Sequence, residues 1–411
     1  MWAKDEYEIK PEAFRGRVER VRQFAVENNL AAVVVYSAPR IHQWSQTGHV
    51  GYISNWSNLD RLTDAMVVVP AEGEPVLLVA GCEYMLDQIS EVSWMQDVRL
   101  VSSPDPRAIA GAYEQTPSGE VASFGQEIVH IIEQHGLANR AVSICGVEAM
   151  PHLLYQDLGR HIPGGISLEE DIVADLRGIK EAGEIEILRQ TAAISDKAYG
   201  TIPEVLQEGM WGYELTAELD RTARSLGADL SYHCMHSGPG DDIRAGKLDI
   251  KAHDRRLQRG DYINVNAYVV YKGYWIQSDR TGTIGPGLGR QGQELFEANL
   301  KVQDKILEIL RPGLGICEIV RLARESATEL GYTLPGDRIG HGQGLDYAEK
   351  PFLTAGNRST LQPGNVFVLH VCLGVPGTNI MLNPIADLCY ITSSGVEILN
   401  SFPRGLFHAG K

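Results

Sequence analysis

The chain has 411 residues, more than a single hydrophobic core ordinarily holds, so we expect two domains. Its hydrophobic fraction of 44% and charged fraction of 22% are typical of soluble globular proteins. A formal net charge of −16 argues against nucleic acid or an anionic membrane as a partner, because both require clustered Lys and Arg. Composition therefore favours a soluble cytoplasmic enzyme.

Targeting and cysteine signals are weak along the whole chain. The first residues show no apolar core followed by a cleavage site, and no apolar run approaches the roughly twenty residues of a membrane span, so we expect neither a signal peptide nor a membrane helix. The six cysteines form no CxxC pair. We expect them to be reduced and mostly buried.

The first part of the chain alternates helix and strand patterns, which predicts an α/β domain over residues 1–165. A turn over 71–75, containing Gly73 and Pro75, separates two Val-rich strands and predicts a hairpin. The predicted helices are 11–29 and 122–136, and the predicted strands are 31–36, 65–70, 75–80 and 140–146.

A second domain is predicted over residues 166–411. Its first segment, 166–200, places apolar residues at helical spacing. Further helices are predicted near 213–226, 293–311 and 316–330. Long, partly alternating strands begin at residue 261, and their pattern predicts antiparallel sheets with helices on one side, an α+β arrangement.

Four stretches of this second part carry motifs in a fixed order. They are GDYINVNAYVVYKGYWIQSDRTGTIG (260–285), IGHGQGLDYAEKP (339–351), LQPGNVFVLHV (361–371) and NPIADLCYITSSGVEILNSFP (383–403). With the segment from Arg177 to Ile185, they resemble the aminopeptidase P/prolidase/creatinase superfamily. The resemblance implies an α+β fold, with a pita-bread catalytic domain preceded by a smaller creatinase-type α/β domain.

In the peptidases of that superfamily, five side chains of these motifs bind a pair of metal ions. The matching positions here hold Asn266, Gln277, His341, His370 and Ala386. Two amides, two imidazoles and a methyl group do not offset the charge of two divalent ions. The resemblance therefore indicates the branch of the superfamily that works without metal, and we expect no cofactor.

That metal-free branch includes creatinase, which hydrolyses a C–N bond. Creatinase has a Glu before the Arg-Thr of the first motif, and here Asp279 precedes Arg280. A carboxylate there can orient a substrate nitrogen or hold a water, although an ion pair with Arg280 is the plainer alternative. The catalytic His of creatinase corresponds by count to Asp249, unless a local gap brings His253 into the site.

His341 and His370 lie on motif positions that face the pocket of the implied fold. Two imidazoles beside one carboxylate can share general-acid and general-base roles. The alternative is a pair of buried core histidines.

Substrate-binding roles are predicted for six residues. Arg61 corresponds to an Arg that reaches a substrate carboxylate across the creatinase dimer interface, and its guanidinium suits that contact. His236 follows His233 and Cys234 in a pattern that resembles a partial zinc ligand set, but a pocket-lining role is more plausible. The full set is Arg61, Asp249, Asn266, Gln277, Glu349 and His236.

The leading prediction is a metal-independent hydrolase of a C–N bond in a small polar nitrogen-containing metabolite, of the creatinase or ectoine hydrolase type. A C–S or C–O lyase on the same scaffold stays open. The alternatives are an Xaa-Pro dipeptidase-like metallopeptidase and a non-catalytic pita-bread binding protein. The resemblance also implies a homodimer with the active site near the subunit interface, and we expect no nucleic-acid or membrane partner.

Overall fold

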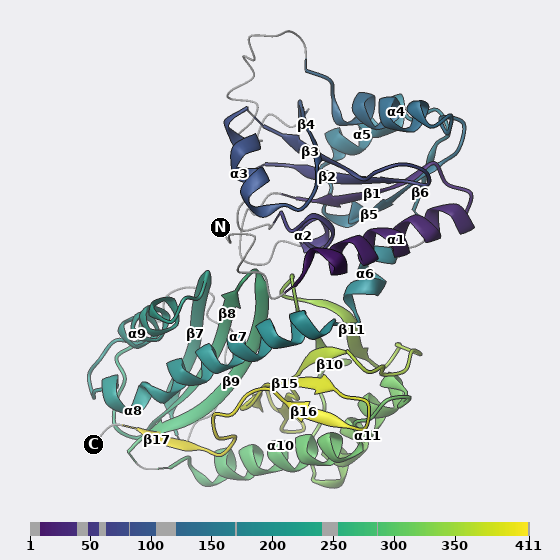
Figure 1. Ribbon diagram of the computed structural model, residues 1–411. Coiled ribbons are helices and arrows are strands. Elements are labelled where there is room, and N and C mark those ends of the chain that lie inside the picture. The colour runs from purple at the N-terminus through teal and green to yellow at the C-terminus, as the bar shows by residue number, and fades with distance from the viewer. Residues whose placement is uncertain are drawn as a thin grey trace. The chain divides into compact units, whose positions relative to one another are not determined.

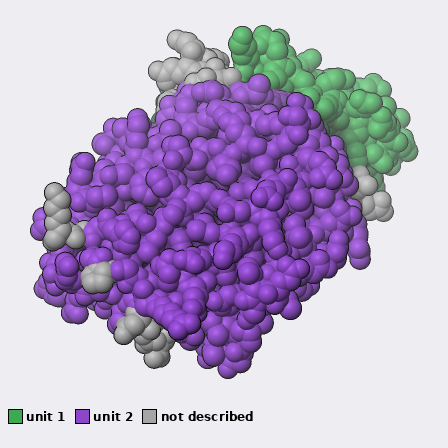
Figure 2. Space-filling model, turned by 90° about the horizontal axis from the view of Figure 1, so that it is seen from below, with its two compact units in different colours: residues 1–177, 345–347 green, residues 178–344, 348–411 purple. Residues whose placement is uncertain are grey.

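The computed structural model describes residues 9–38, 48–56, 63–81, 83–103, 121–168, 171–240, 254–285 and 287–409. The chain forms two compact units, distinguished by colour in Figure 2. Unit 1 comprises Met1–Arg177 with Leu345–Tyr347, and unit 2 comprises Gly178–Gly344 with Ala348–Lys411. The units divide after Arg177, whereas the sequence predicted a domain boundary after residue 165. Among the helices of the described residues, none is both long and apolar enough to cross a membrane.

Unit 1 is built on a six-stranded mixed sheet in the order β4-β3-β2-β1-β5-β6. The strands are β1 (Ala32–Ser37), β2 (Ala65–Pro70), β3 (Val76–Ala80), β4 (Asp97–Val101), β5 (Val142–Cys145) and β6 (Ile166–Ser167). Every residue of β1, β2 and β3 is buried, which explains why these strands read as continuous Val-rich runs. The antiparallel pairing of β2 with β3 confirms the predicted hairpin.

Helices cover both faces of this sheet, and Figure 1 shows α1 and α4 on opposite sides. The elements are α1 (Pro11–Glu27), α2 (Gly48–Ser54), α3 (Tyr84–Val92), α4 (Phe124–Gln134), η3 (Val147–Ala149), α5 (His152–His161) and α6 (Ile172–Arg177). The sequence positions α4 through a capping box, in which Ser123 Oγ accepts from Gln126 N (3.3 Å) and Gln126 Oε1 accepts from Ser123 N (2.8 Å).

Unit 2 contains two larger sheets and a two-stranded ribbon of β13 (Leu373–Gly374) and β14 (Met381–Leu382). One sheet has the order β17-β9-β8-β7, from β7 (Leu230–Pro239), β8 (Asp261–Tyr271), β9 (Tyr274–Ile284) and β17 (Phe407–Ala409). The other has the order β11-β10-β12-β15-β16, from β10 (Arg338–Gly342), β11 (Glu349–Thr354), β12 (Val366–Leu369), β15 (Asp387–Ile391) and β16 (Val396–Ile398). All pairings but the parallel one of β17 with β9 are antiparallel.

Among the described residues of unit 2, five helices flank these sheets: α7 (Ala182–Gly200), α8 (Ile202–Val205), α9 (Gly212–Ser225), α10 (Arg290–Ile309) and α11 (Ile316–Glu329). α7 and α9 pack on the four-stranded sheet. α10 and α11 bury apolar residues against the five-stranded sheet, with Val302, Val320 and Phe367 in one core cluster. Figure 1 shows the two helix pairs on their separate sheets, as the α+β prediction required.

The two sheets of unit 2 meet at Asp279 of β9 and Ala386. These residues exchange two backbone hydrogen bonds of 3.2 Å each. Beside this bridge, Arg280 Nη2 donates to Asp387 Oδ1 at 2.8 Å, and each side chain of that ion pair is only 1% exposed. Arg280 Nη1 also donates to the Ala386 carbonyl at 2.9 Å, while Arg404 Nε donates to the second oxygen of Asp387 at 2.8 Å. A buried cation thus fixes the junction of the two sheets.

Replacing Arg280 tests this junction. Arg280→Met leaves the buried Asp387 with a single cationic partner, so we expect the free energy of unfolding to fall by about 3 kcal/mol. Urea unfolding followed by circular dichroism measures the change. The matched control is Arg290→Met, whose side chain is 92% exposed and pairs only with Glu294, and it should leave the midpoint unchanged. Equal midpoints for both variants would contradict a structural role for the buried pair.

Candidate functional site

One face of the β7–β8–β9 sheet is lined with polar side chains. In the antiparallel register, Asn266 lies opposite both Cys234 and Asp279. Directly opposed residues project from the same face, and side chains alternate along each strand, so the central part of that face contains nine positions. They are Tyr232, Cys234, His236, Asn264, Asn266, Tyr268, Gln277, Asp279 and Thr281. We call this set the polar strand face.

The opposite face of the same sheet is covered by α7. Ser278 Oγ lies 2.9 Å from Ser195 Oγ, and Tyr199 Oη donates to the Ser278 carbonyl at 2.7 Å. Because Ser278 points toward α7, its neighbours Gln277 and Asp279 point away from that helix. The polar strand face is therefore the side on which α7 does not lie.

Amide side chains on the polar strand face form a hydrogen-bonded chain. Asn266 Nδ2 donates to Asn264 Oδ1 at 3.1 Å, and Asn264 Nδ2 donates to Thr281 Oγ1 at 2.9 Å. The chain ends where Thr281 Oγ1 donates to the Pro384 carbonyl at 2.9 Å. Both asparagines are at least 96% buried, so these bonds satisfy groups that water does not reach.

Asp279 is the carboxyl group of this face and is fully buried. Its Oδ2 accepts from Asn383 Nδ2 at 2.7 Å, while its Oδ1 has no hydrogen-bond partner. Burial raises the pKa of Asp279 to about 7, against the lowering effects of Gln277, the Arg280 charge and Asn383. The Arg280 guanidinium pairs with Asp387, so the Asp279–Arg280 ion pair considered from the sequence does not form.

His341 and His370 lie together at the end of the five-stranded sheet. Their ring centroids are 5.3 Å apart at 66°. Burial lowers the pKa of His341 to about 4 and that of His370 to about 3, the latter also through the neighbouring His341. Both rings are therefore neutral near pH 7. His341 Nδ1 lies 3.1 Å from the Gly342 carbonyl, so Nδ1 carries the proton in that ring.

Strand register places His370 in line with Asp279. Leu369 pairs with Asp387, so the next residue, His370, is level with Ala386, which is bridged to Asp279. Two strand spacings of about 4.8 Å put the Cα atoms of Asp279 and His370 roughly 10 Å apart. His370 Nε2 is buried without a hydrogen-bond partner, although the residue as a whole is partly exposed.

The structure places the other predicted site residues in different surroundings or does not describe them. Asn266, Gln277 and His236 belong to the polar strand face, whereas Glu349 forms a 2.6 Å ion pair with buried Lys180. That pairing gives Glu349 a structural partner where the sequence predicted a substrate contact. The predicted residues Arg61, Asp249 and His253 lie outside the described residues.

Sequence reasoning missed three polar residues that hold the site. Asn383 contacts the Asp279 carboxyl, Asn264 links the amide chain, and Gln343 Oε1 accepts from the Gln277 backbone N–H at 2.7 Å. Alternation along β8 was a signal for Asn264, because it lies two residues before Asn266. Nothing local distinguishes Asn383 or Gln343, whose partners are distant in the sequence.

The donor set of unit 2 does not fit a pair of divalent ions. Among the described residues, one group brings three possible ligand atoms of His, Cys, Asp or Glu within 4.8 Å of one another. It consists of His49, Glu148 and Asp171, which belong to unit 1. There Arg177 contacts His49, and its positive charge opposes a bound cation. In unit 2, Asp279 contributes one carboxylate beside neutral amides and imidazoles, which carry too little negative charge for two divalent ions.

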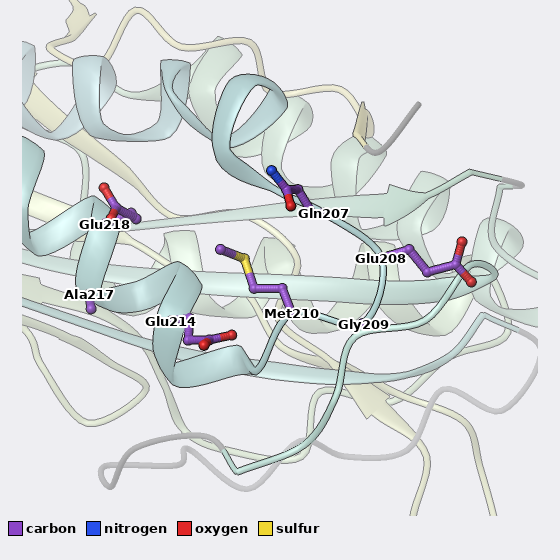
Figure 3. A pocket seen from close by; sticks show the side chains of 7 residues that line it. All are labelled: Gln207, Glu208, Gly209, Met210, Glu214, Ala217 and Glu218. Carbon is purple, nitrogen blue, oxygen red and sulfur yellow. The ribbon is translucent and has the colours of Figure 1, made fainter.

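A separate hollow of unit 2 lies at the start of α9 and is shown in Figure 3. Its lining residues are Gln207, Glu208, Gly209, Met210, Glu214, Ala217 and Glu218. Glu214 caps α9 by accepting from Trp211 N at 2.7 Å, and Glu218 pairs with Arg221 at 2.8 Å. These two acids have structural roles, and no predicted site residue lines the hollow.

The raised pKa of Asp279 predicts a pH-dependent stability. Its folded pKa of about 7 exceeds the ordinary 3.8, so the folded protein binds this proton more tightly than the unfolded chain. Stability then falls as pH rises from about 4 to about 7. We expect Asp279→Asn to lack this loss, which amounts to roughly 3 kcal/mol between about pH 5 and about pH 8 at about 1.4 kcal/mol per pKa unit. Urea unfolding of both proteins at about pH 5 and about pH 8 measures it.

His370 provides a control of opposite sign. Its folded pKa of about 3 is below the ordinary 6.5, so the folded protein binds this proton less tightly than the unfolded chain. The stability that the neutral ring contributes is fully present above pH 6.5. It is lost as the pH falls from 6.5 to about 3. His370→Gln should remove this acid-side loss and leave the Asp279 effect in place. Wild-type slopes in both variants would show that neither group is buried as described.

Several known proteins are similar to this chain in sequence and in fold. The chain is 30% identical over 244 residues to the Xaa-Pro dipeptidase of Pyrococcus furiosus, covering 58% of this chain and 67% of that protein. It is 28% identical over 312 residues to the probable dipeptidase PepE of Mycobacterium bovis, covering 73% and 80%. The prolidase structure from Pyrococcus horikoshii has a TM-score of 0.73 at 22% identity, covering 95% and 99%. The structure of dipeptidase PepE from Mycobacterium ulcerans has a TM-score of 0.75 at 22% sequence identity, and the match covers 97% of this chain and 99% of that one.

These relatives correct the predicted reaction. The structural likeness confirms the predicted pita-bread fold. The prediction of a creatinase-like hydrolase acting on a non-peptide C–N bond is wrong, because the two relatives similar in sequence are dipeptidases. The substituted positions Asn266, Gln277 and Ala386 show a changed donor set, but a donor set does not identify the bond that is cleaved.

The family comparison decides membership. Residues 186–401, just over half of the chain, match the model of metallopeptidase family M24. This match overturns the assignment to a creatinase-like, metal-independent branch, since the family it identifies is one of metallopeptidases. The aminopeptidase P/prolidase superfamily resemblance is confirmed. The chain belongs to metallopeptidase family M24.

Proposed function

We propose that this protein hydrolyses the peptide bond of a short peptide, with a dipeptide that carries proline in second position as the leading substrate. The dipeptidase activity named for the relatives supports the substrate class. The observation that carries the proposal in this chain is His370, a neutral imidazole in line with Asp279 whose buried Nε2 has no hydrogen-bond partner among the described residues. A fully extended dipeptide spans roughly 7 Å, which fits a Cα separation of roughly 10 Å between the two residues.

His370 acts in this proposal as the proton carrier. Its neutral Nε2 accepts a proton from water as the water oxygen attacks the carbonyl carbon of the scissile bond. The imidazolium then returns that proton to the departing nitrogen, so the C–N bond breaks and a carboxyl group and an amine are released. The lowered pKa of His370 makes the imidazolium a strong acid, which favours the second transfer, and makes the neutral ring a weaker base for the first.

His341 orients its neighbour in this scheme. Its Nδ1–H is directed to the Gly342 carbonyl, and its ring meets His370 edge-on. Because both rings are neutral, water activation proceeds without burying a second positive charge beside His370. His341 is therefore a positioning residue, and a substitution there should alter the pH profile of the reaction.

The partner and location predictions carry over to this proposal. The small-molecule partner becomes a short peptide. A homodimer, to which Arg61 of a second copy contributes, and a cytoplasmic location remain expectations of the sequence resemblance.

Proline release from Ala-Pro and Gly-Pro, followed by chromatography, tests the proposed activity. We expect His370→Gln to lower kcat by about 10²–10⁴-fold with a small change in KM, because general acid–base transfer contributes in that range. His408→Gln is the matched control, since His408 is exposed on β17 and contacts Thr283 Oγ1 at 2.8 Å. Absence of cleavage across a panel of Xaa-Pro and other dipeptides would reject the proposal. Unchanged kcat in His370→Gln would reject the role of His370.

A further inference from the structure

A second junction joins β9 to the segment that follows β10, beside the bridge at Asp279. Trp275 N donates to the Gly344 carbonyl at 2.6 Å, and Gln277 N donates to Gln343 Oε1 at 2.7 Å. In the second of these bonds a side-chain oxygen takes the place of a backbone carbonyl. The spacing between β9 and the other sheet at Gln277 therefore depends on the length of one side chain.

Gln343 belongs to the strand register that carries the two histidines. Its backbone N–H donates to the Val366 carbonyl at 3.2 Å, which continues the pairing of His341 with Val368. Directly opposed residues share a face and side chains alternate along β12, so Gln343, His341 and His370 project from one face. The β12 residues between these positions belong to the apolar cluster with α10 and α11, on the opposite face.

The backbone at Gln343 is held firmly. The Gln343 side chain is fully buried. At the next residue, Gly344, a Cβ atom would collide with Glu349 Oε1 and would lie 2.8 Å from Lys180 Cε. The buried Lys180–Glu349 ion pair, 2.6 Å long, thus packs directly against Gly344. The segment that carries Gln343 is supported by this ion pair as well as by β9.

We propose that Gln343 is a positioning residue whose side chain sets the separation between the two histidines and Asp279. Its oxygen ties Gln277, two residues before Asp279, to the face that carries His341 and His370. This inference rests on the proposed function, in which His370 transfers protons to a peptide bound beside Asp279. A misplacement of about 1 Å costs on the order of 10²-fold in rate, so the loss of one hydrogen bond here slows the chemical step.

Three substitutions test the role of the Gln343 oxygen. Gln343→Met keeps the length of the side chain but removes the acceptor. Gln343→Asn keeps an amide but shortens its reach by about 1.5 Å, and it keeps the test informative if Gln343→Met folds poorly. Both should lower kcat for Ala-Pro by roughly 10²-fold with little change in KM. Gln343→Glu retains an oxygen acceptor at full reach in either protonation state, so it should restore kcat to within about tenfold of wild type.

An NMR spectrum of the full chain labelled with ¹³C-histidine gives a readout that does not depend on cleavage. The ring signals of His341 and His370 are assigned from the variants His341→Gln and His370→Gln. Because ring signals respond to the packing around each ring, both should move in Gln343→Met and return toward their wild-type positions in Gln343→Glu.

Asn400→Leu is the matched control. Asn400 Oδ1 accepts the backbone N–H of buried Leu388 at 2.9 Å, which is the same kind of bond in the same unit. This variant should lower the urea midpoint of unfolding, as Gln343→Met does, because each leaves a buried strand N–H without its acceptor. It should leave kcat and both ring signals as in wild type.

The outcomes separate this inference from the proposed function. Wild-type kcat in Gln343→Met and Gln343→Asn, or a loss that Gln343→Glu does not restore, would overturn the positioning role. An equal loss of kcat in Asn400→Leu would also overturn it, since the effect would then be one of general stability. If the wild-type protein cleaves no dipeptide, the proposed function fails and the ring signals alone decide: signals that move and are restored support the positioning role, and unmoved signals overturn it.

Discussion

The arrangement of unit 2 depends on the bridge between Asp279 and Ala386. Two backbone hydrogen bonds join the sheets there, and Arg280 anchors the junction by reaching Asp387 and the Ala386 carbonyl. Since side chains alternate along a strand, this register sends Arg280 to the α7 side, where its guanidinium lies 5.9 Å from the Tyr199 ring centroid. A slip of one residue would place Arg280 on the polar strand face and bury Asp279 against α7.

Burial acts in opposite directions on the ionisable groups of the site. It raises the pKa of Asp279 and lowers those of His341 and His370, because a low-dielectric environment disfavours whichever form is charged. Near neutral pH the site therefore carries at most one negative charge, on Asp279. The neutral imidazoles each keep one lone pair that can accept a proton.

The comparison with relatives shows where reasoning from individual positions reached its limit. Asn266, Gln277 and Ala386 differ from the ligand types of the peptidases, and by themselves these positions predict a different reaction. Similarity over more than half of the chain instead places it in the M24 family and shows dipeptidases among its relatives. The substituted positions determine which ions and groups fit the site, while the substrate depends on the surfaces around it.

Local patterns in the sequence were sufficient to predict most helices and strands and part of the site. The Val-rich runs of β1, β2 and β3, the turn at Gly73 and the apolar spacing of α7 are encoded within short windows. Alternation along β8 and β9 likewise places Asn266, Gln277 and Asp279 on one face once the strands pair. The motif order located His341 and His370 in the same domain.

Contacts between distant segments were decided only by the tertiary structure. Asn383 reaches Asp279 across 104 positions, and Lys180 reaches Glu349 across 169, so no local window contains either pair. The pKa values follow from the same packing, because desolvation depends on every segment that covers a group. The sequence by itself determined the fold family and the chemical types available at the site. The packing of the two sheets decided which of those groups face one another and which are neutral.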